Sequence, residues 1–185
     1  TASNLWTIMT SLPELKDRVG KCLGAEHGVN IEGLAIKGDR LFFGFREPAQ
    51  DGFVPVLGVD ADALFKGGDA KPRVTSIAVG AGRGIRDLAA VKDGVLILAG
   101  PDDSEANKDV HVTISLWDGE SSDTGPVTPR SLAELDLRDV KLRECDKELK
   151  PEALAVIEDA SDHYRVAVLS DGMCDGGPMT FVIPR

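Results

Sequence analysis

The chain has 185 residues, of which 42% are hydrophobic, and it carries a formal net charge of −10 at pH 7. This length is enough to bury a core in one domain or in two small ones. The acidic balance opposes the phosphates of nucleic acids and the anionic surface of membranes, so the sequence predicts neither as a partner. No stretch approaches the roughly 20 apolar residues that cross a bilayer, and we expect a soluble protein of the cytoplasm or the periplasm.

Alternating apolar and polar residues, bounded by glycine, proline and aspartate, predict short strands along nearly the whole chain. In chain order the predicted strands cover residues 5–10, 31–36, 40–46, 53–59, 73–79, 84–91, 95–100, 110–117, 131–137, 151–157, 164–170 and 179–183. Tight polar turns at 37–39 and 92–94 predict hairpins between paired apolar runs. Little helix is expected, with at most two turns over 12–18 and again over 142–149.

One phrase occurs three times, as Glu32–Ile36, Arg86–Ala90 and Glu152–Val156. Each copy has a charged residue, a small or acidic one, then Leu-Ala and an apolar residue, and each is followed by a second apolar run. The aligned leucines are 54 and 66 residues apart, which is longer than the roughly 40–50 of common propeller repeats. The sequence therefore predicts one domain over 1–185, built from repeats at about 30–80, 84–137 and 150–185.

The expected fold class is all-β, and within it a β-propeller. Three four-stranded antiparallel blades would radiate from an axis lined by their first strands, with Leu34, Leu88 and Leu154 packed between neighbouring blades. A β-sandwich is the alternative, but its strands need not share a phrase. Propellers close with 4–8 blades, so three blades predict a half-ring or a fragment of a larger propeller, such as a six-bladed one.

The two ends of the chain look complementary. Residues 1–12 are expected to hold the outer strand of an adjoining blade, whereas the third repeat ends without an outer strand. We therefore expect association, either with the remaining half of a longer propeller or between two copies that exchange terminal strands.

Three cysteines, Cys22, Cys145 and Cys174, leave at least one thiol unpaired within the chain. A bridge between the second and the third is one possibility, and reduced structural cysteines are the interpretation we favour. Zinc is not indicated, because the chain has no Cys-x-x-Cys pair.

Several ordered phrases resemble a bacterial family known as domain of unknown function 3616 (DUF3616). They are Asn30-Ile-Glu-Gly-Leu-Ala35, Gly44-Phe-Arg-Glu-Pro48, Gly82-Arg-Gly-Ile-Arg-Asp-Leu88, Leu98-Ala-Gly-Pro101, Lys150-Pro-Glu-Ala-Leu154 and Leu169-Ser-Asp171. The resemblance spans about 30–175 and implies the C-terminal portion of longer members, with no known activity. A more distant likeness to esterase-like phytase and gluconolactonase-type propellers implies a possible divalent ion, such as calcium, in the axial channel.

Glu32, Arg86 and Glu152 hold the same place in the three repeats and should converge near the axis. The two glutamates, with Asp171 or Asp175 and water, could hold a divalent cation through hard oxygen ligands. The competing interpretation is structural, in which the glutamates pair with arginine and tie the blades together.

Arg46, Arg83 and Arg86 are candidate donors for a carboxylate or phosphate, because the guanidinium group binds such anions through two hydrogen bonds. The glycine-rich turn at 80–84 lacks the lysine spacing of a nucleotide-binding loop. Ser170 has no recognisable His-Asp partners, so serine hydrolase chemistry is not indicated.

The sequence therefore predicts a binding or assembly module that uses its axial channel face, with self-association and a small anionic ligand as partners. The alternative is a divalent-metal-dependent hydrolase acting on an ester, lactone or phosphoester. In that enzyme Glu32 and Glu152 would hold the metal, Arg86 would orient the anionic group, and metal-bound water would attack.

Overall fold

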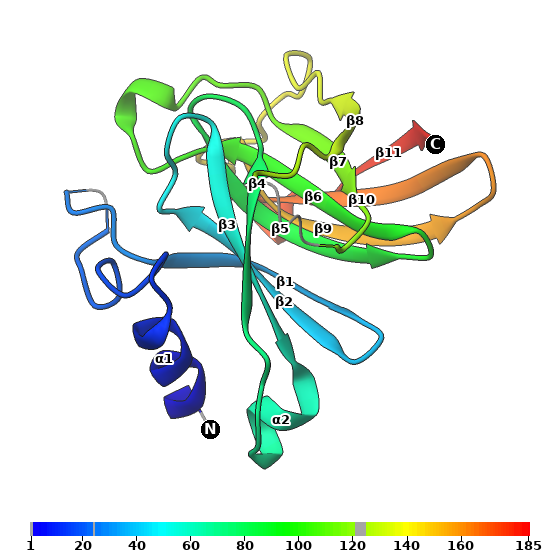
Figure 1. The fold of residues 1–185 in the computed structure, drawn as a ribbon. Coiled ribbons are helices and arrows are strands. Elements are labelled where there is room, and N and C mark those ends of the chain that lie inside the picture. Colours follow the sequence, from blue (N-terminus) through cyan, green and yellow to red (C-terminus); the bar gives the residue numbers. More distant parts are fainter. Residues whose placement is uncertain (1, 24, 121–124) are drawn as a thin grey trace.

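The computed structural model of the protein describes residues 2–23, 25–120 and 125–185. It consists mainly of antiparallel strands in three sheets (Figure 1). The strands are β1 (Asn30–Lys37), β2 (Arg40–Glu47), β3 (Phe53–Asp60), β4 (Arg73–Ala78), β5 (Arg83–Val91), β6 (Gly94–Pro101), β7 (Thr113–Trp117), β8 (Arg130–Glu134), β9 (Lys150–Asp159), β10 (His163–Asp171) and β11 (Met179–Pro184). The helices are α1 (Ala2–Ser11), α2 (Ala61–Lys66) and the short 3-10 turns η1 (Glu105–Asn107) and η2 (Cys174–Gly176).

Each sheet is built from one continuous stretch of chain. The strand orders are β1-β2-β3-β4 in the first sheet, β5-β6-β7-β8 in the second and β11-β10-β9 in the third. The first hairpin closes on the pair Lys37 and Arg40, and the second on Val91 and Gly94, so each has a two-residue loop. A two-residue loop fixes the register in which the two strands of its hairpin pair, and the later strands of the sheet then pair in sequence with them.

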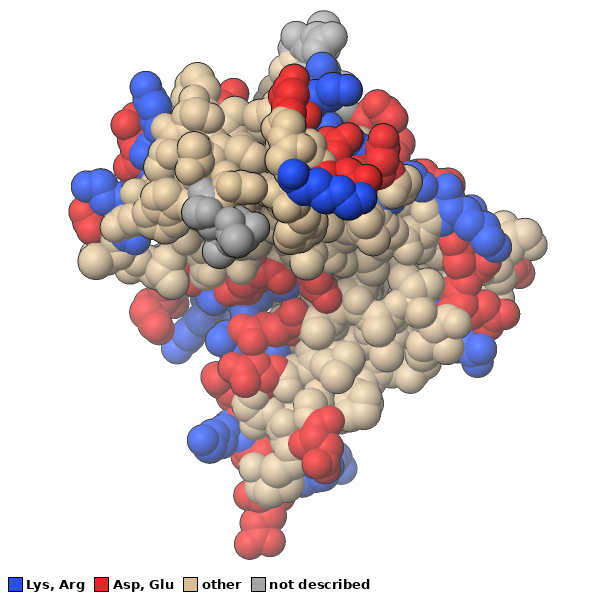
Figure 2. Space-filling model, turned by 90° about the horizontal axis from the view of Figure 1, so that it is seen from below, with Lys and Arg blue, Asp and Glu red and all other residues tan. Residues whose placement is uncertain are grey.

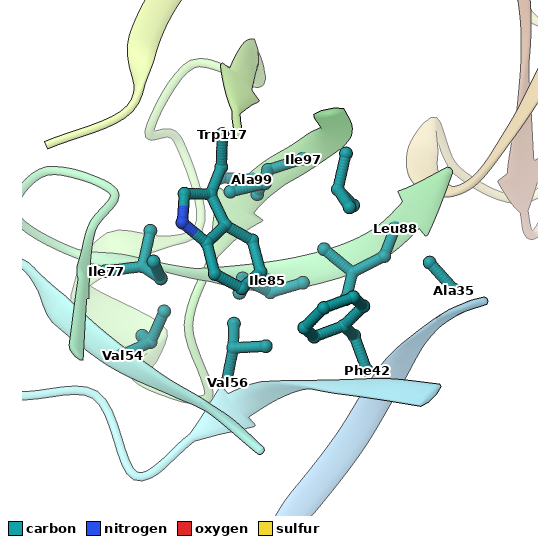
Figure 3. Packing of buried hydrophobic residues seen from close by; sticks show 11 residues of the cluster. Ala35, Phe42, Val54, Val56, Ile77, Ile85, Leu88, Ile97, Ala99 and Trp117 are labelled. Carbon is teal, nitrogen blue, oxygen red and sulfur yellow. The ribbon is translucent and has the colours of Figure 1, made fainter. Parts of the chain in front are cut away.

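The first sheet packs on the second through an apolar cluster shown in Figure 3. Phe42 of β2 meets Trp117 of β7 edge to face, with ring centroids 5.1 Å apart. Two glycines allow the close approach of Leu88. A Cβ at Gly33 would lie 2.8 Å from the Leu88 Cγ, and a Cβ at Gly44 would lie 3.1 Å from its Cδ1. Because real Cβ atoms essentially never approach below 3.0 Å, the sheets can meet here only where a side chain is missing on the first sheet.

The second sheet packs on the third through a separate cluster that includes Leu98, Leu154 and Tyr164. Tyr164 donates its hydroxyl to Asp93 at 2.7 Å, and Arg185 lies over the same ring, 4.5 Å from its centroid. Among the described residues, no apolar cluster joins the first sheet to the third. The sheets are therefore stacked in chain order, first on second and second on third.

The outer face of the first sheet is covered by helices, which corrects the predicted strand at 5–10. That segment belongs to α1, below the first sheet in Figure 1. Leu5, Ile8, Met9 and Leu12 recur at helical spacing, and all four pack in the third apolar cluster of the structure. The expected outer strand of an adjoining blade over residues 1–12 is therefore wrong for the described residues.

Two further expectations differ from the structure. The third sheet has three strands, so the predicted number of four strands in each sheet holds for the first two sheets only. The second helix, α2, was not predicted, although Asp60 caps it by accepting a hydrogen bond from the Ala63 amide at 2.8 Å, and Gly67 follows it. Residues 142–149 form one turn, at 144–145, within chain that has no regular secondary structure, instead of a helix.

The aligned leucines occupy equivalent positions but different surroundings. Leu88 is 3% exposed against the first sheet and Leu154 is 6% exposed against the second, as expected for residues between neighbouring sheets. Leu34 is 55% exposed, because no described sheet lies in front of the first. The prediction of a buried position is wrong for Leu34.

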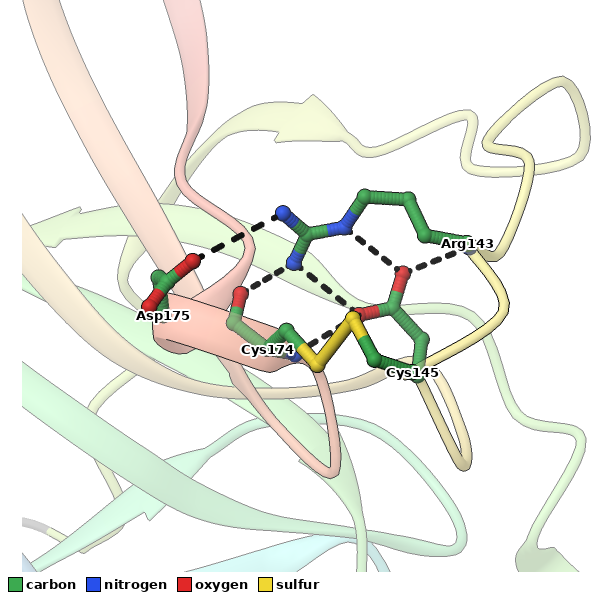
Figure 4. The surroundings of a disulfide bond; sticks show 5 residues. Arg143, Cys145, Cys174 and Asp175 are labelled. Atoms are coloured by element: carbon green, nitrogen blue, oxygen red, sulfur yellow. Dashed lines mark hydrogen bonds and ion pairs between the residues drawn. A yellow bond between two sulfur atoms is a disulfide. The ribbon is translucent and has the colours of Figure 1, made fainter.

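Cys145 and Cys174 form a disulfide, so the preference for reduced cysteines at these positions is wrong, whereas Cys22 is free and exposed. Figure 4 shows how the bridge and its neighbours hold the loop before β9 against η2. Asp146 accepts hydrogen bonds from the Cys174 amide at 2.6 Å and from the Arg143 guanidinium. The hydrogen bonds from Arg143 hold the pKa of the Asp146 carboxyl well below its usual range.

Charged side chains of both signs are interspersed on the surface. Figure 2 shows acidic and basic groups gathered along the margins of the face seen from below, beside a broad area without charge. No helix in the described parts of the chain combines the length and apolar character needed to cross a bilayer.

Candidate functional site at the starts of the first strands

The same irregularity occurs near the start of the first strand in all three sheets. In β1, β5 and β9 the pairing register skips one residue, and the skipped residues are Glu32, Arg86 and Glu152. A bulge of this kind redirects the side chain of the extra residue out of the normal alternation. The aligned charged residues are therefore presented by the same local geometry in each repeat.

The structure brings these three side chains together. Arg86 is 1% exposed and lies between the two glutamates. Its Nε is 3.1 Å from the Glu32 Oε2, its Nη2 donates to the Glu152 Oε1, and its Nη1 donates to the Pro101 carbonyl at 3.2 Å. One guanidinium of the second sheet thus links the first strands of all three sheets.

Two more cations complete this ionic cluster. The Arg46 Nη1 lies 3.2 Å from the Glu32 Oε1, and its Nε lies 2.9 Å from the Asp103 Oδ1. Lys150 Nζ lies 2.8 Å from the Glu152 Oε1. The three cations Arg46, Arg86 and Lys150 therefore face the three carboxylates of Glu32, Asp103 and Glu152, and the cluster compensates its own charge.

Burial and neighbouring charges act in opposite directions on the pKa of Arg86, the most buried member of the cluster. Burial lowers the pKa of Arg86, the nearby Glu32 and Glu152 carboxylates raise it, and Arg46 lowers it further. The Nε atoms of both arginines lie within ion-pair distance of a carboxylate but make no well-aligned hydrogen bond. Each guanidinium therefore keeps one donor that is electrostatically paired without being fully satisfied.

A second convergence involves a residue that the sequence did not single out. The Asp87 carboxylate accepts hydrogen bonds from the amides of Leu88 at 2.8 Å and of Leu154 at 2.7 Å, and also from the amide of Leu34. These are the aligned leucines of the three repeats. Burial raises the pKa of Asp87, and the three amides act in the opposite direction. The sequence does mark this position, because the second copy of the repeated phrase has the acid Asp87 where the other two copies have the small residues Gly33 and Ala153.

A cleft of about 880 Å³ opens beside the ionic cluster. Arg46 and Arg86 contribute to its lining, together with residues 101–105, 108–112, 134–138 and 148–151. Two pairs of lining side chains contact each other: the His111 Nδ1 lies 2.5 Å from the Glu134 Oε1, and the Arg138 Nη2 lies 2.6 Å from the Asp136 Oδ2. Sequence reasoning missed this cleft, because its walls come from separate connections that carry no common motif.

Comparison with known proteins supplies a family but no activity. A family model described as "Protein of unknown function (DUF3616)" matches residues 2–175. The chain belongs to the DUF3616 family. Neither the curated proteins nor the solved structures contain a match to it. The biochemical function of the DUF3616 chain must therefore be argued from its own residues.

Of the remaining predicted site residues of the DUF3616 chain, Asp171 lies at the exposed edge of the cluster, and Arg83 and Asp175 lie outside it. Arg83 Nε donates to the His111 carbonyl at 2.8 Å, and Arg83 does not line the cleft. Asp171 is exposed, 3.8 Å from Lys150 Nζ, and Asp175 is exposed near Arg143. Of the predicted anion-binding set, the structure thus brings Arg46 and Arg86 together and leaves Arg83 apart.

The acidic residues predicted to hold a metal already face cations in this DUF3616 chain. Glu32 lies against Arg46 and Arg86, and Glu152 lies against Arg86 and Lys150. Among the described residues, Cys145, Asp146 and Cys174 form a group with metal-ligand spacing, but the two sulfurs are joined in the disulfide. Calcium between Glu32 and Glu152 would require a rearrangement in which Arg86 leaves the glutamates.

Proposed function

We propose that this DUF3616 protein is a β-propeller-type module that acts by binding and assembly through its axial face. The observation that carries the proposal is the place of Arg86 between Glu32 and Glu152. Equivalent residues of successive repeats meet in this way when the first strands of radiating sheets line a common axis. Three such sheets correspond to a half-ring or a fragment of a larger propeller, for which six blades lie within the usual range of 4–8.

A small anionic ligand, such as a carboxylate or phosphate, is the proposed occupant of the cleft at the Arg46 and Arg86 end. Both guanidinium groups line the cleft, and each has an Nε that makes no well-aligned hydrogen bond. A ligand anion could take over these donors by displacing a carboxylate of the cluster. Arg83, the third residue of the sequence-based proposal, would contribute only by holding the 111 carbonyl and hence the cleft wall.

The test is a thermal unfolding series with inorganic phosphate and with mono- and dicarboxylates at constant ionic strength. We expect one class of anion to raise the Tm of the wild type by several degrees and to lose this effect in Arg46→Gln. Arg165→Gln is the matched control, because it removes a guanidinium that pairs with Glu158 outside the cleft, and this variant should retain the response. An equal response in all three proteins, or none in the wild type, would refute the proposed site.

The metal-dependent hydrolase, with calcium at Glu32, Glu152 and Asp171, is the alternative and has less support. A cation lies against both glutamates, and Asp171 is exposed beyond Lys150. A rise in Tm with calcium that is reversed by a chelator and absent in Glu32→Gln would favour this alternative. We expect no such rise.

A further inference from the structure

The cleft beside the ionic cluster also has an apolar part, which the proposed anion site does not use. Val112 and Leu135 line it and are only 5% and 6% exposed, and the Leu135 amide donates to the Val112 carbonyl at 2.9 Å. Both residues belong to the apolar cluster between the second and third sheets. One part of the cleft wall is therefore formed by the edge of the core.

Two further apolar residues line the cleft without packing in the core. Val110 lies in the connection before β7, and Leu149 lies immediately before β9. Both are partly buried, and neither belongs to any of the three apolar clusters found among the described residues. Apolar side chains of this kind are available for contact with a ligand, and sites for small molecules are lined mainly by such groups.

Hydrogen bonds hold both of these residues in place. The Val110 amide donates to the Asn107 carbonyl at 3.0 Å. On the other connection, the amide of Lys150, which follows Leu149, donates to the Ser170 hydroxyl at 2.6 Å. Because both apolar wall residues are fixed in this way, a ligand would spend little of its binding free energy on ordering them.

The volume of the cleft indicates a ligand larger than an inorganic anion. At about 880 Å³, the cleft lies within the roughly 300–1,000 Å³ of sites that bind small organic molecules. A water molecule takes up about 30 Å³ of liquid, so a bare carboxylate or phosphate would fill only a small part of the cleft. The apolar lining favours a ligand that fills the remainder with apolar groups.

The charges of the lining favour a ligand with a single negative charge. Arg46 and Arg86 both line the cleft, and each has a buried Nε without a well-aligned hydrogen bond. By contrast, Glu105, Asp109 and Glu148 line the same cleft, and their side chains make no ion pair within the described part of the chain. These carboxylates would repel a dianion more strongly than a monoanion.

We propose that the ligand of the cleft is a monocarboxylate that carries an apolar chain. Its carboxylate binds the guanidinium groups of Arg46 and Arg86, and its chain lies against Val110 and Leu149. The inference rests on the anion site proposed above and adds the chemical class of the ligand. Affinity then has two sources, a carboxylate that needs the arginines and a chain that needs the apolar wall.

The test is isothermal titration of the protein with straight-chain carboxylates from acetate to octanoate, at constant ionic strength and at concentrations below micelle formation. We expect the affinity of the wild type to rise about two- to fourfold with each added methylene group, because each one removes apolar surface from water. Octyl phosphate, a dianion, and octylammonium, a cation, have the same chain and should both bind more weakly than octanoate.

Variants separate the contribution of the carboxylate from that of the chain. Leu149→Ser should weaken octanoate binding about five- to tenfold and leave butanoate binding nearly unchanged, and Val110→Ser should act in the same direction from the other connection. Leu142→Ser is the matched control, because Leu142 is 46% exposed in the same connection as Leu149 and does not line the cleft. Arg46→Gln should remove the binding of every carboxylate.

The outcomes distinguish this inference from the proposed function. Binding that depends on Arg46 but does not strengthen with chain length would overturn the inference and leave the anion site standing. Failure of every anion to bind would overturn both. A chain-length dependence that survives Arg46→Gln, Leu149→Ser and Val110→Ser would place the chain elsewhere on the surface and would also overturn the inference, as would octylammonium binding as tight as that of octanoate.

Discussion

The amide of Leu154 donates a hydrogen bond of 2.7 Å to the carboxylate of Asp87, which lies in the preceding repeat. The same carboxylate binds the amides of Leu34 and Leu88. A side chain of the middle repeat therefore fastens the backbone of all three first strands at equivalent positions. Together with Arg86 it fixes how the three sheets converge.

Removing the Asp87 carboxylate should destabilise the protein strongly. In Asp87→Ala three backbone amides lose their acceptor, and leaving such donors unsatisfied should reduce the free energy of unfolding by about 2–4 kcal/mol. The measurement is urea-induced unfolding followed by circular dichroism. Asp171→Ala, at an exposed carboxylate, is the control and should change stability by less than about 0.5 kcal/mol. Equal effects of the two substitutions would contradict the role given to Asp87.

The contribution of Asp87 should depend on pH in a defined direction. Burial raises its pKa, so the folded state binds the proton more tightly than the unfolded state does. Stability from this effect is fully present below the unfolded pKa of about 3.9 and is lost as pH rises through the folded pKa. The difference in unfolding free energy between wild type and Asp87→Ala should therefore narrow as the pH rises above about 4. A difference that widens as the pH rises would contradict the raised pKa of Asp87.

The joint between the first two sheets should not tolerate a methyl group at Gly33. The added Cβ would lie 2.8 Å from the Leu88 Cγ, and overpacking of this kind costs about 1–3 kcal/mol. The check is a double-mutant cycle with Leu88→Ala, since shortening the leucine removes the closest of the contacts that the added Cβ would make and leaves those with Ile85 and the Asp87 backbone. We expect Gly33→Ala to cost clearly less in the Leu88→Ala background. If Gly33→Ala lowers the free energy of unfolding equally in both backgrounds, the strain does not come from the contact with Leu88.

The disulfide should stabilise the loop that forms one wall of the cleft. Cys145 and Cys174 are separated by 29 residues, and opening a loop of this length should reduce stability by about 3–4 kcal/mol on the chain-entropy account. A reductant should lower the Tm of the wild type and leave the Cys145→Ser, Cys174→Ser double variant unchanged. Equal Tm values for the wild type with and without reductant would show that the bridge contributes nothing to stability.

Much of this fold could be predicted from the sequence, because strands and tight turns leave local signals. Alternation and the two-residue loops identified the strands of the three sheets, and the recurring phrase placed Glu32, Arg86 and Glu152 at equivalent positions. The segment at 5–10 was misassigned because Leu5, Ile8 and Met9 also satisfy a helical period, and the face they cover becomes apparent only after the first sheet has formed.

The site was less predictable, because its partners are distant in sequence. Asp103 and Lys150 join the ionic cluster from connections between strands, where no periodicity marks them. The cleft depends on residues near 108 and near 136 coming together, which is a result of tertiary packing alone. The exposure of Leu34 could not be deduced from its alignment with Leu88, since burial depends on whether a neighbouring sheet is present.

The central claim is that Arg86 couples successive repeats through the glutamates at the starts of their first strands. A double-mutant cycle of Arg86→Met and Glu152→Gln, measured as unfolding free energy in urea, tests it most directly. Because the guanidinium is buried and bonded to this carboxylate, we predict a coupling of at least about 1 kcal/mol. Additive effects, within about 0.3 kcal/mol, would show that the two residues do not interact and would contradict the account.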